Sequence, residues 1–442
     1  WEIYAGLRGS INGNSGLIGI LLPEMQRANN TYSYDDIPAR LADNIKSGYS
    51  KMYNWDYAMS NFKIIIDEAF ENRKKLKNSI DIINFDENYE KKLEICVGKI
   101  PEINEKIYIP EKGLYQNILI TGTIGTGKTS SAMYPFTEQL IEYESENYGK
   151  KIGMLILDVK GNYFNQVRKF AYKYNRLDDV IVIELGGKYK YNPLNKPNLK
   201  ASVLANRLKI ILELFSGKTT ESYWIDKSEQ ILCECIKFCR LYNDGYVNFE
   251  ELHNLVTNQN YYIEKIEIVK KLFQKNKFSK EECYDLLTSI TFFEKEFYKL
   301  DSRTMSILKS EITRITNCFI SDYQVSKTFN PTQIEQNFYG LEEILSKGKI
   351  VVLNMNIAEY KNLSKIIAAY LKLDFQSEVL SRLAQNNKNK TRPVAFISDE
   401  YHEYITETDA DFFAQSREAK CINIVATQSY TSLLKTLNDE SI

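Results

Sequence analysis

The chain has 442 residues, of which 43% are hydrophobic and 26% are charged, the composition of an ordinary soluble globular protein with two or three domains. Its formal net charge of −1 gives no sign of a nucleic-acid or membrane partner, although a ring-shaped assembly can confine basic residues to its pore. Seven scattered cysteines exclude a disulfide framework and fit a reducing cytoplasm.

Residues 1–93 form an N-terminal region of unclear role, which we predict to be helical. Residues 37–76 combine broken helical periodicity with many charges, a pattern typical of two helices. The longest early apolar run, residues 16–22, is shorter than the ~18 residues of a membrane span. Because the chain begins at Trp1 rather than at methionine, we expect it to be a fragment of a longer protein.

Short apolar runs separated by turns replace the helical pattern from about Glu94. Residues 107–110 are typical of an edge strand, because Pro110 cannot donate a backbone hydrogen bond to a neighbour. Three buried strands are predicted at residues 117–121, 152–157 and 180–184, with helical stretches between them. Such alternation predicts a parallel sheet that helices cover on both faces.

The alternation stops between about Ala201 and Lys327, where apolar residues such as Leu204 and Leu208 recur at helical spacing. Strands resume at residues 350–353, 394–397 and 422–426. The predicted fold class is therefore α/β. Residues 94–200 and 331–442 form one domain around a parallel central sheet, and residues 201–330 form an all-α domain inserted into it.

The segment Gly122–Thr129 reads GTIGTGKT and matches the phosphate-binding pattern G-x-x-x-x-G-K-[ST]. A predicted strand precedes it and a helical pattern over residues 130–143 follows it, as phosphate binding requires. Glycines let backbone amides surround the phosphates at a helix N-terminus, Lys128 reaches the β- and γ-phosphates, and the Thr129 hydroxyl binds Mg²⁺. The residues predicted to bind ATP are Gly122, Thr123, Ile124, Gly125, Thr126, Gly127, Lys128, Thr129 and Ser130.

ATP hydrolysis also needs an acidic residue near the metal, at the end of a strand beside this loop. Asp158 and Asp399 both follow predicted strands. Asp399 is favoured because Glu400 follows it: the aspartate can hold Mg²⁺ through water while the glutamate deprotonates the attacking water. Asp158 is followed by Val-Lys-Gly, which supplies no base. Its alternative roles are a switch or neighbour-contact residue, or a helix cap.

Three further polar residues have ordinary interpretations beside functional ones. Gln428 follows the predicted strand 422–426, where it either senses the γ-phosphate or is a plain strand-end residue. Arg417, in a helical pattern, is by itself typical of a solvated surface residue. His402, two residues beyond Glu400, either lines the site or is solvated or packed, and the second is the more common case.

Taken together, these motifs resemble those of the coupling-protein ATPases of type IV secretion and conjugation, the TraG/TraD-like branch of the HerA/FtsK superfamily. The resemblance covers about residues 94–442. Residues 157–161 are similar to the family's Asp-Pro-Lys-Gly element, with Val159 in place of the proline, and Trp224 matches its Phe-Trp position. The remaining matches, in the family's order and spacing, are the phosphate loop, Tyr191–Leu194, Ser398–Tyr401, Ser416–Arg417 and Ala426–Gln428.

The resemblance implies a RecA-like nucleotide-binding domain in a homohexameric ring, with ATP and Mg²⁺ between neighbouring subunits. In such a ring Arg417 is the arginine finger delivered in trans, Gln428 reads the γ-phosphate, and the catalytic set is Lys128, Glu400, Arg417 and Gln428 with Asp399 at the metal. The family translocates DNA through a central pore. It delivers DNA–relaxase complexes and protein substrates to a type IV secretion channel at the cytoplasmic face of the membrane, and membrane segments outside this chain would anchor it there.

Two alternatives remain open. The same motor could serve chromosome segregation or end processing, as in other FtsK/HerA members, although the helical insert disfavours this. The chain could also be a substrate-receptor platform that uses ATP binding for assembly, against which the intact Asp399–Glu400 pair argues.

Overall fold

The computed structural model describes residues 91–158, 160–215, 222–275, 278–360, 362–384 and 389–437. The predicted helices at 37–76 and the apolar run at 16–22 lie outside these residues. Contacts divide the chain into two compact units, of which the larger comprises Lys92–Lys99 and Tyr108–Ile442. Within the described ranges, no helix combines the length and the apolar character that crossing a membrane requires.

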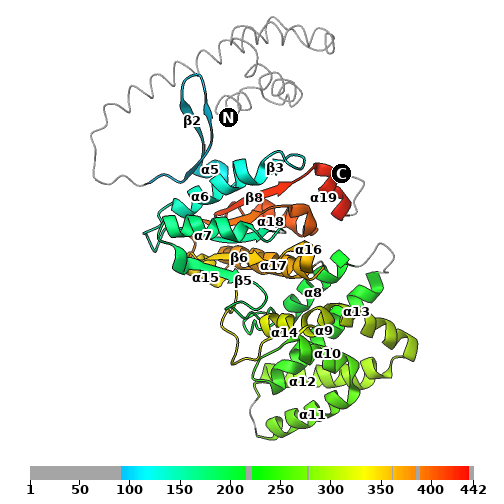
Figure 1. Ribbon diagram of the computed structural model, residues 1–442. Coiled ribbons are helices and arrows are strands. Elements are labelled where there is room, and N and C mark those ends of the chain that lie inside the picture. Colours follow the sequence, from blue (N-terminus) through cyan, green and yellow to red (C-terminus); the bar gives the residue numbers. More distant parts are fainter. Residues whose placement is uncertain are drawn as a thin grey trace, which may run out of the picture. The chain divides into compact units, whose positions relative to one another are not determined.

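Six parallel strands form the central sheet, in the order β3-β8-β7-β4-β6-β5. Figure 1 labels β3, β8, β6 and β5 among them. The six predicted buried strands agree with them to within one residue at either end, and the predicted parallel sheet is confirmed. The bounds are β3 (Ile118–Thr121), β4 (Gly153–Asp158), β5 (Val180–Ile183), β6 (Ile350–Asn354), β7 (Val394–Ser398) and β8 (Cys421–Thr427).

The side chains of β4 show why this sheet lies inside the molecule. Alternate residues of a strand face opposite sides of a sheet. Met154 and Ile156 belong to a hydrophobic cluster with α6 (Tyr134–Glu142) and α7 (Tyr163–Lys173). Leu155 belongs to a second cluster with α17 (Asn362–Ala384). Both faces are therefore covered by helices, and polar groups are accessible mainly where the strands end.

A separate two-stranded sheet consists of β1 (Glu94–Ile100) and β2 (Glu105–Pro110). The predicted edge strand at residues 107–110 lies within β2. No prediction was made for β1, whose exposed and buried residues do not alternate cleanly. The short helices beside the central sheet are α5 (Glu111–Leu114), α15 (Glu342–Lys347), α16 (Ile357–Tyr360), α18 (Asp409–Gln415) and α19 (Tyr430–Leu437).

Between Ala201 and Phe329 the described residues form helices and connecting turns (Figure 1). The predicted boundaries at 93, 200 and 330 stay predictions, because one compact unit includes both the helices and the sheet. The helices are α8 (Ala201–Phe215), α9 (Ser222–Tyr242), α10 (Phe249–Thr257), α11 (Gln259–Gln274), α12 (Lys280–Thr291), α13 (Ser302–Ile320) and α14 (Tyr323–Phe329), with short π- and 3-10-helical turns over Phe292–Lys299.

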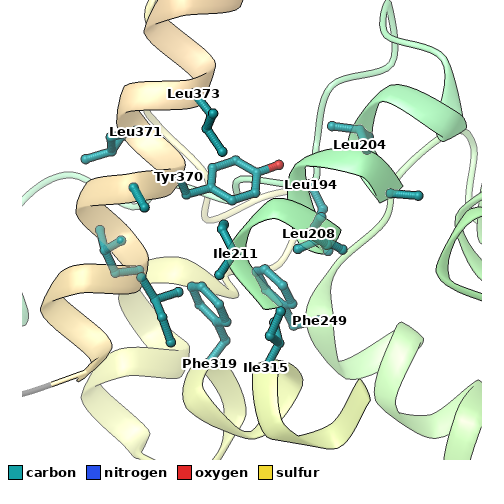
Figure 2. Close-up of a cluster of buried hydrophobic side chains, with 14 of the residues drawn as sticks. Leu194, Leu204, Leu208, Ile211, Phe249, Ile315, Phe319, Tyr370, Leu371 and Leu373 are labelled. Carbon is teal, nitrogen blue, oxygen red and sulfur yellow. The ribbon is translucent and has the colours of Figure 1, made fainter. Parts of the chain in front are cut away.

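A continuous hydrophobic core joins this helical segment to α17 under the sheet. Figure 2 shows Tyr370 of α17 beside Leu194 and the α8 residues Leu208 and Ile211. The carboxylate of Asp374, also on α17 and fully buried, accepts hydrogen bonds from Arg207 of α8 (2.8 Å), from Lys196 (2.8 Å) and from Tyr191 (2.9 Å). Burial alone would raise the pKa of Asp374, but the charges of Lys196 and Arg207 hold it at about 2. Apolar packing and a compensated buried charge therefore both connect the two regions.

Candidate nucleotide site

The phosphate loop spans residues 122–127 between β3 and the next helical turn. Gly125 and Gly127 have φ of +82° and +83°, a conformation that residues with a Cβ adopt only at a cost. A Cβ on Gly122 would lie 2.6 Å from Thr126 Oγ1, so a larger residue there would displace the Thr126 side chain. Ile124 at the loop's tip is 81% exposed. The loop therefore presents its backbone to solvent, as phosphate binding needs.

Lys128 begins the helical segment after the loop, and its side chain folds back over it. Its Nζ donates to the carbonyl oxygens of Gly122 (2.5 Å) and Thr123 (3.2 Å), which fixes a positive charge at the mouth of the loop. The predicted helix over residues 130–143 begins instead with a π-helical turn at Lys128–Met133 and ends in α6 at Glu142. Pro135 accounts for the wider turn, because it has no N–H to donate to Ser131 four residues earlier.

Asp399 follows β7 at the carboxyl edge of the sheet and contacts the loop segment directly. Its carboxylate is fully buried, and Oδ2 accepts a 2.7 Å hydrogen bond from the hydroxyl of Thr129, which is 270 residues away in the sequence. Its backbone is fixed from two sides: its N–H donates to the carbonyl of Leu157 on β4 (3.1 Å), and its carbonyl accepts from the phenol of Tyr404 (2.8 Å). The fold thus brings together the two residues predicted to hold Mg²⁺.

Asp158, the other candidate for the metal, occupies a different role. Its carboxylate accepts backbone hydrogen bonds from Lys160 (2.9 Å), Asn162 (3.0 Å) and Tyr163 (3.0 Å), and so starts α7. These bonds satisfy N–H groups that the first turn of a helix leaves without partners. The geometry favours the helix-cap alternative for Asp158, and the metal role of Asp399 stays a prediction.

Glu400 adopts a left-handed backbone conformation with φ of 48°, which costs about 1–2 kcal/mol for a residue with a Cβ. Its side chain is only 9% exposed. Oε2 accepts a weak hydrogen bond from Gln428 Nε2 (3.4 Å) and lies 3.7 Å from His402 Nδ1. His402 also contacts Thr427 Oγ1 at 3.2 Å, so it is part of this site rather than of the surface. Gln428 reaches Glu400 because β8 lies between β3 and β7.

Lys160 is a site residue that the sequence analysis missed. Its Nζ lies 3.3 Å from Glu400 Oε1 and 3.9 Å from Asp399 Oδ2. Partial burial works to lower the pKa of Lys160, but the carboxylates of Asp399 and Glu400 outweigh it and raise that pKa above its usual value. Strand order would have revealed the contact, since β4 and β7 are neighbours and the residues that follow them meet.

Arg417 is the one predicted catalytic residue that the structure places elsewhere. It is exposed in the turn between α18 and β8, at the amino edge of the sheet. The seven residues of β8 separate this edge from the phosphate loop, a length of roughly 20 Å. Within one chain, Arg417 therefore does not reach Lys128 or Glu400.

The turn that carries Arg417 is nonetheless well ordered by buried polar contacts. Asn423 of β8 donates from Nδ2 to the hydroxyl of Ser416 (2.9 Å) and to the side-chain oxygen of Asn117 (2.7 Å). The N–H of Cys421 also donates to the carbonyl of Ser416 (3.0 Å). Arg417 is therefore an exposed residue on a turn whose neighbours make buried polar contacts.

No protein-family model matches the sequence, and no curated protein matches it either. The fold does match solved structures. The bacterial conjugative coupling protein TrwBdeltaN70, in its unbound monoclinic form, is 14% identical with a TM-score of 0.52 over 79% of this chain and 69% of that chain. Plasmid coupling protein TrwB in complex with the GTP analogue GDPNP is also 14% identical, with a TM-score of 0.51 over 79% of this chain and 70% of that chain.

The same coupling protein TrwB, solved in complex with ADP and Mg²⁺, is 14% identical with a TM-score of 0.50 over 74% of this chain and 67% of that chain. The chain therefore has the fold of a conjugative coupling protein, with a RecA-like P-loop domain and an all-α domain. The predicted fold class is confirmed.

Proposed function

We propose that the chain is an ATP-hydrolysing coupling protein that translocates DNA and delivers DNA–relaxase complexes to a type IV secretion channel. The observation that carries this proposal is the 2.7 Å hydrogen bond between Thr129 and Asp399, which joins the phosphate loop to the acidic pair on β7. If the glycine-rich loop had only a structural role, it would need neither Asp399 nor Glu400 beside it. The fold shared with TrwB, which has been solved with ADP and Mg²⁺, supports the same conclusion.

The donor set fits Mg²⁺ and ATP. Backbone amides of the loop and the Lys128 ammonium would hold the phosphates, while the Thr129 hydroxyl and, through water, Asp399 would hold the metal. Bound Mg²⁺ neutralises charge on the phosphates. Glu400, a carboxylate held in a nearly closed site, would orient the attacking water and accept its proton. Gln428, at the end of β8, would sense whether the γ-phosphate is present.

Each site would be completed by a neighbouring subunit in a homohexameric ring. A head-to-tail ring places one edge of each subunit against a different edge of the next. Arg417 at the amino edge of the sheet, away from its own phosphate loop, suits delivery to the neighbour's ATP. Charge at the transferring phosphoryl group is what such an arginine stabilises.

Mixing two inactive variants tests this arrangement. Arg417→Ala subunits keep an intact phosphate loop, and Lys128→Ala subunits keep the arginine. In an equal mixture, roughly a quarter of the interfaces should pair an intact phosphate loop on one subunit with an intact Arg417 on the next. We therefore expect about a quarter of the ATPase activity of the unaltered protein to reappear. Co-purification of differently tagged variants must show that mixed rings form. Mixed rings without any recovered activity would contradict a role for Arg417 in trans.

DNA dependence tests the proposed function itself. A DNA motor should hydrolyse ATP several-fold faster with DNA, and this stimulation should fall as salt rises, because phosphate contacts release counterions. Comparing rates with and without DNA across a salt series measures both. A rate indifferent to DNA at every salt concentration would contradict the motor and favour the receptor platform. Genes for a relaxase and a secretion channel beside this gene would separate conjugative transfer from segregation or end processing.

A further inference from the structure

Lys160 places a positive charge at the nucleotide site in addition to that of Lys128, and none of the roles described so far uses it. Its Nζ lies 3.3 Å from Glu400 Oε1, the carboxylate proposed to activate water. The same Nζ lies 3.9 Å from Asp399 Oδ2, the oxygen that also receives the hydroxyl of Thr129. The ammonium therefore lies among the groups that would surround the metal and the terminal phosphate.

The backbone of Lys160 makes a local hydrogen bond, whereas its side chain is half-exposed. The N–H of Lys160 donates to Asp158 Oδ1 (2.9 Å). The next residue, Gly161, has φ of +70° and packs so closely on Asn356 that a Cβ there would lie 3.3 Å from it. The Lys160 side chain, in contrast, is 51% exposed and has four flexible carbons. Its ammonium can change partners without any rearrangement of the turn.

Energetics favour a change of partner when ATP binds. A half-exposed ion pair such as Lys160–Glu400 stabilises by about 1 kcal/mol or less. Mg²⁺ beside Asp399 would repel the ammonium from that carboxylate, while the terminal phosphate offers several negatively charged oxygens nearby. The ammonium also occupies Glu400 Oε1, so release of the pair would free this oxygen to approach the attacking water.

We propose that Lys160 is a γ-phosphate ligand. This role rests on the proposed ATPase function. The ammonium of Lys160 would pair with Glu400 before ATP binds and with the γ-phosphate afterwards. The move would couple recognition of ATP, as opposed to ADP, to the freeing of the catalytic base. No bond is made or broken in this step, and only the position of one ammonium group changes.

The test compares affinities for two nucleotides rather than activities. In Lys160→Met, which keeps the length of the side chain and removes its charge, binding of Mg²⁺–AMP-PNP should weaken about 10- to 100-fold, the range that a charge-assisted hydrogen bond supplies. Binding of Mg²⁺–ADP, which has no γ-phosphate, should change less than about twofold by the same reasoning. Titration calorimetry on the full chain measures both. Lys169→Met, which removes an exposed lysine of α7, is the matched control and should change neither affinity.

Each other outcome has a definite meaning. Equal weakening for both nucleotides, or none for either, would overturn the assignment while leaving the ATPase proposal intact. Tighter binding of AMP-PNP would overturn it too, because the lysine would then compete with the metal. Lys160→Arg retains a positive charge and should recover part of the preference for AMP-PNP. If the unaltered chain bound neither nucleotide, both this inference and the proposed function would fall.

Discussion

Replacing Lys128 by alanine is expected to abolish ATP hydrolysis. The Lys128 ammonium lies at the mouth of the phosphate loop, where Gly122 and Thr123 carbonyls hold it. Charge grows on the bridging and terminal phosphate oxygens as the phosphoryl group is transferred, and a preorganised cation there acts with little cost of reorganisation. Loss of one such group lowers turnover by about 100- to 1,000-fold. We expect the residual rate to be indistinguishable from background in a phosphate-release assay.

Two comparisons make the Lys128 result specific. Lys169→Ala removes an exposed lysine of α7 and should keep full activity. Lys128 also bridges the two ends of its own loop, so thermal unfolding of the variant must be compared with that of the unaltered chain. Turnover above about a tenth of the original rate in a folded Lys128→Ala variant would contradict the assignment of this loop as the catalytic phosphate site.

Most of the sheet could be predicted from the sequence, because its strands are buried on both faces. The residues of β4 from Gly153 to Asp158 are all buried, so they form an apolar run that ends sharply at polar residues. For β1 this signal fails, since exposed and buried positions follow no clear alternation. The sequence shows Pro135 within the predicted helix. It does not show that the backbone N–H groups before this proline bond carbonyls five residues earlier, as in the π-helical turn at Lys128–Met133.

The candidate site was predictable only where its residues occupy a recognised motif. The spacing of glycines, lysine and threonine over residues 122–129 predicts the phosphate loop, and Asp399 was preferred because Glu400 follows it. Lys160 belongs to the element at residues 157–161, but that motif did not assign it to the site: its contact with Glu400 follows from the adjacency of β4 and β7, which is a property of the strand order. The helix-cap role of Asp158, which the sequence left open among alternatives, likewise depends on three backbone N–H groups that donate to its carboxylate.

Changing Glu400 to glutamine is expected to separate ATP binding from hydrolysis. Glutamine has nearly the same volume, so it fits the same nearly closed position, and its carbonyl oxygen can still accept the hydrogen bond from Gln428. An amide cannot accept a proton from water at neutral pH. General-base catalysis contributes about 100- to 10,000-fold, so turnover should fall by that factor. Affinity for Mg²⁺–ATP should stay within a few-fold, about 1 kcal/mol, because Glu400 does not contact the phosphate loop.

The Glu400→Gln experiment needs binding and turnover measured on one preparation, since only their divergence identifies a base. Glu407→Gln, an exposed residue in the segment after β7, is the matched control and should alter neither quantity. Equal loss of binding and turnover would mean that Glu400 supports the fold of the site through its strained backbone instead of acting on water. Full hydrolysis by the glutamine variant would remove Glu400 from the catalytic set.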